Sequence, residues 1–179
     1  MKTKLITEIV FKSSPKYKMY KAEYLSIWRC YGEKIIKTFY KITNLPFIED
    51  KIIGIVGEGD ANKDNNAGKN INKPMLFRYN IRNKLGTILH ELSHRLIMEH
   101  AIFEKSKKKF NFTDEHQIID LFLFDVMEDM FGKKAALFRV EYEKGFFDPK
   151  YSRCWNEAIN LTKKERFIKL SKIINYCQK

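Results

Sequence analysis

The chain has 179 residues, of which 44% are hydrophobic, so it can bury one core and we expect a single domain over residues 1–179. No run of 18 apolar residues occurs, and Glu8 and Lys12 interrupt the N-terminal apolar stretch, which argues against a membrane span and a signal peptide. The three cysteines include no CxxC pair, which argues against a disulfide framework and a cysteine-based zinc site. We therefore expect a cytoplasmic protein.

The formal net charge of +12 makes nucleic acid a candidate partner, because clustered lysines neutralise phosphates. The basic residues are nevertheless scattered along the chain. Only two local runs stand out: Lys105 with Lys107, Lys108 and Lys109, and Lys163 with Lys164, Arg166, Lys169 and Lys172. A solvated face explains each run without a nucleic-acid partner, so composition alone does not require one.

The first half of the chain predicts a small sheet with one long helix. Residues 4–12 alternate as a strand, and Ser14 with Pro15 then begins a helix that we expect to continue to about Tyr40. A second strand is expected at residues 52–56, and a third at residues 74–80. The segment between these two strands, from residue 57 to 70, is rich in Gly, Asn, Asp and Lys, which is typical of a loop.

The second half predicts only helices. Apolar residues from about Asn83 to Phe103 form one helical stripe, and a second, acidic helix is expected from Thr113 or Asp114 to Gly132. Three further helices are expected near residues 135–143, 149–161 and 163–176, the last with a capping box made by Thr162 and Glu165. The predicted fold class is therefore α+β, with an N-terminal sheet and a mainly helical C-terminal half.

The helix that begins near Asn83 carries the sequence HELSH at residues 90–94. His90 and His94 are one helical turn apart, so both imidazoles can reach a single cation. Glu91 projects beside that cation, where a carboxylate can take a proton from a metal-activated water. All four histidines of the chain lie between positions 90 and 116, which favours a metal site over two histidines that are merely part of an amphipathic helix.

This motif resembles the HExxH motif of the zincin metallopeptidases, and the preceding strand and following helix resemble a minimal form of that fold. The resemblance implies a Zn²⁺ cofactor and a zinc-dependent metallopeptidase or amide hydrolase, in which Glu91 is the general base and activated water attacks a peptide carbonyl. It also implies that residues 75–79 form the edge strand of the sheet, to which an extended peptide or protein substrate can pair. The residues themselves leave an interior strand equally open.

Three residues are candidates for the third metal ligand. His100 has the spacing of the metzincin pattern, but Ile97 stands where that pattern has glycine, and in a continuous helix His100 points away from His94. Gluzincins are zincins that take their third ligand from a second helix after the HExxH motif. The resemblance to them places the ligand near the start of the acidic helix, where Glu115 and His116 stand. In gluzincins an aspartate four residues after the ligand hydrogen-bonds a metal-bound histidine.

Asp120 lies four residues after His116, whereas Glu115 is followed at this spacing by Ile119. We therefore prefer His90, His94 and His116 as the ligands and keep Glu115 as the alternative. Asp120 and Asp125 also interrupt an otherwise apolar helix, so their carboxylates need buried partners, which a metal or histidines bound to a metal would supply.

Two functional classes remain open at this point. The first is the zinc-dependent hydrolase. The second is a non-enzymatic protein stabilised by zinc, with basic faces that bind nucleic acid or a protein partner. The presence of Glu91 favours the enzyme, because a purely structural zinc site needs no general base.

Overall fold

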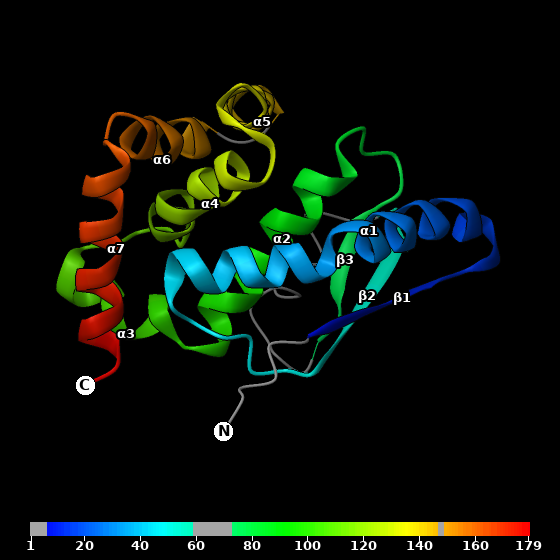
Figure 1. Cartoon of the computed structure of the whole chain (residues 1–179), viewed down its shortest axis with the longest axis horizontal. Helices are drawn as coiled ribbons and strands as arrows, with labels where there is room; N and C mark the ends of the chain where they lie inside the picture. Colours follow the sequence, from blue (N-terminus) through cyan, green and yellow to red (C-terminus); the bar gives the residue numbers. More distant parts are fainter. Residues whose placement is uncertain (1–6, 59–72, 147–148) are drawn as a thin grey trace. The chain divides into compact units, whose positions relative to one another are not determined.

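The structure is a computed structural model that describes residues 7–58, 73–146 and 149–179 (Figure 1). Its contacts divide the chain into two compact units. The N-terminal unit comprises the described residues up to Lys37 together with Leu45–Glu99, and the C-terminal unit comprises Thr38–Asn44 and His100–Lys179.

The N-terminal unit is built on a parallel sheet whose three strands follow the order of the chain, β1-β2-β3. The strands are β1 (Glu8–Ser13), β2 (Lys51–Gly57) and β3 (Met75–Arg78). Alternate side chains of β1 and β2 are buried, as expected when one face of a sheet covers a core. Among the described residues β3 pairs only with β2, so it lies at an edge of this sheet.

Helix α1 (Lys18–Thr43) follows β1 after a short 3-10 turn at Pro15–Tyr17. Proline is favourable in the first turn of a helix because backbone N–H groups there have no acceptor within the helix, so the absence of this group costs no hydrogen bond. Within the N-terminal unit, Tyr24 of this helix is fully buried, and its hydroxyl donates a hydrogen bond to the carbonyl of Arg78 at the end of β3. The Tyr24 ring also lies against Phe11 and Phe77, so aromatic packing joins α1 to the sheet.

Gly54 in the middle of β2 lies where these aromatic rings approach the sheet most closely. A Cβ atom at this position would lie 2.8 Å from Cε2 of Phe77 and 3.1 Å from Cδ1 of Phe11. Glycine is therefore required by packing at this point, because even a methyl group would overlap the buried rings.

We predict that Gly54→Ala lowers the free energy of unfolding by about 1–3 kcal/mol, because the added methyl group overpacks the core. Gly57→Ala is a matched control in the same strand, since its Cβ would meet nothing closer than 4.0 Å. Urea unfolding followed by circular dichroism measures both variants. Equal stability of the two variants would contradict the packing explanation.

Helix α2 (Lys84–Glu99) begins at Asn83, whose side-chain oxygen accepts a hydrogen bond from the backbone N–H of Gly86. The helix ends earlier than the sequence predicts, because Ala101 adopts a left-handed conformation and a separate helix α3 (Ile102–Phe110) follows. The expectation of one continuous helix to Phe103 was wrong. Apolar periodicity continues across the break, so the hydrophobic pattern gave no sign of it.

The C-terminal unit is helical throughout its described residues. After α3 it contains α4 (His116–Phe131), α5 (Lys133–Phe146), α6 (Pro149–Ile159) and α7 (Lys163–Cys177). Helix α4 packs against α5, α6 and α7, and most of its side chains are buried. A helix that is apolar on all sides belongs at the centre of a bundle, and α4 is the centre of this one. Gly132 ends it with a φ of 84°.

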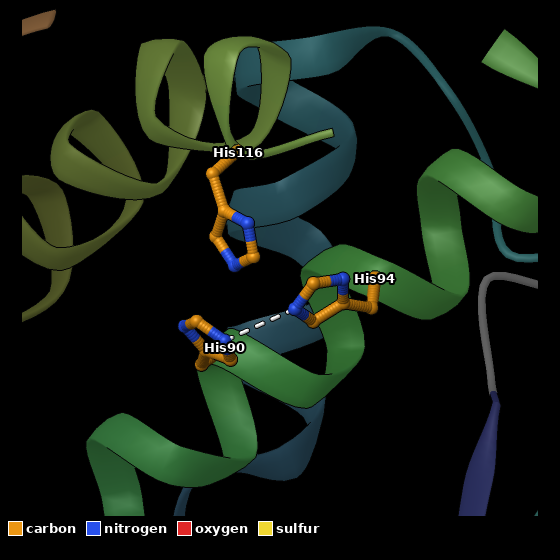
Figure 2. A group of neighbouring side chains, drawn as sticks. All are labelled: His90, His94 and His116. Carbon is orange, nitrogen blue, oxygen red and sulfur yellow. Dashed lines mark hydrogen bonds between the residues drawn. The ribbon is translucent and has the colours of Figure 1, made fainter. Parts of the chain in front are cut away.

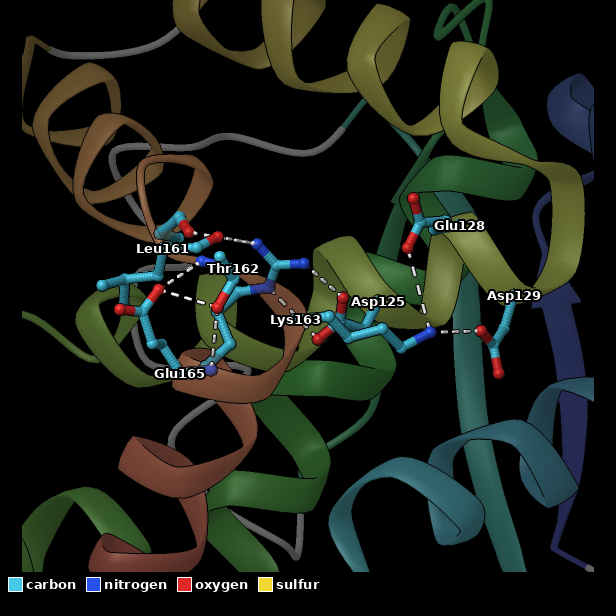
Figure 3. A network of polar contacts seen from close by, with 9 residues as sticks. Asp125, Glu128, Asp129, Leu161, Thr162, Lys163 and Glu165 are labelled. Carbon is cyan, nitrogen blue, oxygen red and sulfur yellow. Dashed lines mark hydrogen bonds and ion pairs between the residues drawn. The ribbon is translucent and has the colours of Figure 1, made fainter.

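A polar network joins α4 to α7 at the surface and in the core of this unit (Figure 3). The carboxylate of Asp125 accepts hydrogen bonds from Nε and Nη2 of the buried Arg166, at 3.2 and 2.6 Å. Nearby, Lys163 reaches Asp129 at 2.7 Å. The buried partner of Asp125 is therefore an arginine, and the expectation of a metal or a metal-bound histidine was wrong for this residue. The predicted capping box of Thr162 and Glu165 is confirmed at the start of α7.

The α+β fold class predicted from the sequence is confirmed, with a small parallel sheet in the N-terminal half and helices after it. None of the helices in the described ranges is both long enough and apolar enough to cross a membrane.

Candidate metal centre

Two of the predicted ligands lie on one face of α2. Nε2 of His90 and Nε2 of His94 are 3.0 Å apart, and the two rings meet edge to face. His90 is buried and His94 is half-buried. Two nitrogens bound to one tetrahedral zinc ion at ordinary lengths lie about 3.3 Å apart, so this pair is already close to the spacing that zinc needs.

The third predicted ligand, His116, is the first residue of α4 and is buried. Its Nδ1 lies 2.6 Å from Oδ1 of Asp114, and the same oxygen accepts a hydrogen bond from the backbone N–H of His116. A carboxylate on Nδ1 favours the tautomer that presents a lone pair at Nε2 and raises the basicity of that nitrogen. His116 is thus oriented as histidine ligands of metals commonly are.

One nitrogen from each of the three imidazoles lies within 4.8 Å of the others. Figure 2 shows them as neighbouring side chains, with His90 and His94 on α2 and His116 on α4. Three histidine nitrogens in a mostly buried cluster suit zinc, which is commonly bound by neutral imidazoles. Of the described residues, neither His100 nor Glu115 belongs to this cluster.

The placement of the remaining predicted residues is mixed. Glu91 is half-buried on α2, one residue after His90. Glu115 stands at the N-terminal boundary of α4. His100 lies in the turn after α2, so our reason for setting it aside, a continuous helix, does not hold, although the cluster forms without it.

Asp120 is completely buried on α4, and both of its carboxylate oxygens lack a hydrogen-bond partner among the described residues. Burial raises the pKa of this carboxyl well above its ordinary value, and the nearby charges of Glu143 and Asp114 raise it further. The hydrogen bond expected from Asp120 to a ligand histidine is therefore not formed among the described residues, and this role of Asp120 stays a prediction for the metal-bound protein. The carboxylate that the structure places on a candidate ligand is Asp114.

Sequence reasoning missed two neighbours of His116. Asp114 was considered only as a possible start of the acidic helix, although an aspartate two residues before a histidine at a helix start can bind both its backbone N–H and its ring. The second neighbour is Tyr151, whose ring centroid lies 4.3 Å from that of His116. Nothing in the sequence places Tyr151, which is 35 positions away, against this histidine.

Comparison of the chain with protein-family models, curated proteins and solved structures finds no match. The function of the three-histidine cluster is therefore inferred from the chemistry of its residues.

A hydrolase would also need a donor to the developing oxyanion, and the C-terminal half of the sequence offers four candidates with different surroundings: Arg139, Tyr142, Tyr151 and Arg153. Arg139 is buried, and its guanidinium binds Glu143 through Nε and Nη2 at 2.7 and 2.6 Å. Glu143 also accepts a hydrogen bond from the indole N–H of the buried Trp155. Because its guanidinium is bound to Glu143, Arg139 has a structural role in the core of the C-terminal unit. The ring of Tyr151, by contrast, lies against the predicted ligand His116, as described above.

The C-terminal end of α2 carries a second cluster of ionisable groups. Glu99 accepts a hydrogen bond from the backbone N–H of Ile48 at 2.7 Å and lies beside Glu49, which pairs with the buried Arg95 at 3.1 Å. Burial raises the pKa of Glu99 from an ordinary value of 4.5 to about 7, and the neighbouring carboxylate of Glu49 adds to this effect.

This shift predicts that the N-terminal unit loses stability as the pH rises from about 4.5 to about 7, because the folded state binds the Glu99 proton more tightly than the unfolded state. Glu99→Gln keeps an oxygen for the Ile48 N–H and removes the titration. It should exceed the wild type in free energy of unfolding by about 1–2 kcal/mol at pH 8 and by much less at pH 5.

Urea unfolding of the wild type and Glu99→Gln at both pH values measures this difference. The exposed Glu8→Gln in the same unit is the control and should not change the pH dependence. If the difference in free energy of unfolding between the wild type and Glu99→Gln is the same at pH 5 and at pH 8, the buried carboxyl is not the cause of the pH dependence.

Proposed function

We propose that the protein is a zinc-dependent metallopeptidase or amide hydrolase whose Zn²⁺ is bound by His90, His94 and His116. The proximity of the three imidazole nitrogens carries this proposal. It is supported by the 3.0 Å separation of the nitrogens on α2 and by the Asp114 carboxylate on Nδ1 of His116. Three protein ligands leave a fourth tetrahedral position open, as in catalytic zinc sites.

Zinc would supply a Lewis acid that polarises a carbonyl group and lowers the pKa of water. The role of Glu91 is to accept the proton of the attacking water and later return it to the leaving amine. Its position directly after His90 on α2 suits this role. Among the described residues, none forms an ion pair with the Glu91 carboxylate, so the base is not neutralised by a cation.

The alternative is that zinc only stabilises the fold. The two functions differ in the fourth coordination position, which a protein side chain fills in a structural site and water or substrate fills in a catalytic one. The metal cluster of the described residues contains three histidines and no carboxylate, which favours the catalytic function.

We predict that the wild type contains about one zinc ion per chain after dialysis and that His116→Ala loses most of it, because two histidine ligands bind zinc far more weakly than three. His100→Ala is the matched control and should keep its zinc. Elemental analysis measures the metal, and circular dichroism establishes that each variant is folded. A wild type that takes up no zinc when it is supplied would refute the metal site.

We predict that Glu91→Gln keeps its zinc and lowers the rate of peptide hydrolysis by at least about 100-fold, because the amide cannot accept the proton of water. Release of fluorescence from a quenched peptide library measures hydrolysis, and elemental analysis measures zinc in the same samples. The exposed Glu104→Gln should hydrolyse the library as the wild type does. Zinc-loaded wild type and Glu91→Gln that are equally active, or equally inactive, would favour the structural alternative.

A further inference from the structure

The ends of α3 and α7 meet in a small aromatic cluster at the surface of the C-terminal unit. The ring of Phe110 stacks on Phe112 with 5.6 Å between centroids, and its edge meets Tyr176 of α7, also at 5.6 Å. Tyr176 is 42% exposed, while Phe110 and Phe112 are half-buried. An aromatic ring is therefore held in place by its neighbours and still presents part of its surface to solvent.

Lysines surround this cluster. Lys172 lies four residues before Tyr176, on the same side of α7, and Lys179 lies three residues after Tyr176, just beyond the end of the helix. Lys109 directly precedes Phe110 on α3, and all three lysines are exposed. In the described part of the chain, no acidic side chain forms an ion pair with any of the three.

Few acidic residues lie near these lysines in the sequence, and Asp114 and Glu115, which follow Phe112 by two and three positions, are the exceptions. Residues 166–179 contain no Asp or Glu. Helix α3 has a single acidic residue, Glu104, and this one is paired with Lys107 at 2.5 Å. We call Lys109, Phe110, Phe112, Lys172, Tyr176 and Lys179 the aromatic-basic patch.

Lysines and aromatic rings together suit one class of partner better than others. An acidic peptide would use the lysines but would not need the rings. A helix that lies on a membrane needs a broad apolar face, which one partly exposed ring and two half-buried rings do not provide. Nucleic acid uses both, because phosphates bind lysines and bases stack on aromatic rings. Bases are free to stack on a protein ring only where they are not enclosed in a duplex.

We propose that the aromatic-basic patch binds single-stranded nucleic acid, with phosphates on Lys109, Lys172 and Lys179 and a base stacked on Tyr176. This binding uses residues of α3 and α7 and the Phe112 that follows α3. It does not depend on the proposed hydrolase function.

Fluorescence anisotropy of the full chain with labelled 15-nucleotide probes, oligo(dT) and oligo(U), tests the proposal. We expect both probes to bind at 50 mM KCl and to dissociate as KCl is raised to 200 mM, because bound phosphates release counterions. A duplex of the same length should bind less tightly than the single strands, since its bases cannot stack on Tyr176. The ratio of the affinities for oligo(dT) and oligo(U) tells DNA from RNA as the preferred strand.

Two pairs of variants separate charge from stacking. The double variant Lys109→Glu, Lys172→Glu should weaken binding at least about tenfold. It should also reduce the slope of log affinity against log salt concentration by the amount that one to two phosphate contacts contribute. Lys133→Glu with Lys134→Glu makes the same change of charge at exposed positions of α5 and should weaken binding much less. Tyr176→Ala should weaken binding about five- to hundredfold with an unchanged salt slope, while Tyr176→Phe should bind like the wild type.

Thermal unfolding establishes that each variant is folded before its affinity is interpreted. Three results would overturn the proposal: equal weakening by the α5 and patch charge variants, full binding by folded Tyr176→Ala, or no binding of either probe at 50 mM KCl. Vesicles of phosphatidylserine and phosphatidylcholine are the lipid comparison. Vesicle binding that needs the same residues while the oligonucleotides do not bind would assign the patch to a membrane surface.

Discussion

The candidate centre depends on a regular helix that continues unbroken through His90 and His94. Their nitrogens are 3.0 Å apart because residues four positions apart project from the same side of a helix. The cap at Asn83 lies eleven residues before His94, and the left-handed Ala101 follows His94 by seven residues, so both histidines lie well inside the regular helix. The buried face of α2, with Leu89, Leu92 and Leu96, holds the helix in its unit while the histidines lie off that stripe.

The central element of the C-terminal unit is helix α4, which is apolar on nearly every side. The two aspartates that it buries differ in their hydrogen bonding. Asp125 is paired with an arginine and Asp120 is not paired within the described residues. A buried carboxyl without a hydrogen-bond partner is costly, and proteins retain such groups mainly where they serve a site. Substitution of Asp120 is therefore as informative as substitution of the histidines, although its expected hydrogen bond to a ligand histidine is not formed among the described residues.

The sequence predicted the strands, the long first helix and the helices of the C-terminal half to within a few residues, because hydrophobic periodicity and capping residues act locally. The capping box at Thr162 and the end of α4 at Gly132 are both of this kind. The break at Ala101 escaped prediction because alanine favours helix and rarely takes a left-handed conformation. The predicted loop at residues 57–70 lies almost entirely outside the described residues, so its conformation stays a prediction.

The candidate ligands could be chosen from spacing, because two of them lie on one helix. The environment of His116 could not, because Tyr151 comes from a helix far along the chain and Asp114 acts through a local turn that helix periodicity does not describe. The partner of Asp125 was equally hidden. The sequence showed that this carboxylate needed a buried partner, and we expected a metal or metal-bound histidines, but the packing of α7 on α4 brings Arg166 to it instead.

Arg166 also shapes how this protein can change. Its guanidinium donates hydrogen bonds to the backbone carbonyls of Ala158 and Leu161 while it binds Asp125. One side chain therefore joins the end of α6, the turn after it and the middle of α4. An inserted or deleted residue in that turn would move the carbonyls relative to the carboxylate and leave a buried charge without its full set of partners. The short connection between α6 and α7 should consequently keep its length over evolution, although turns between helices usually tolerate insertions.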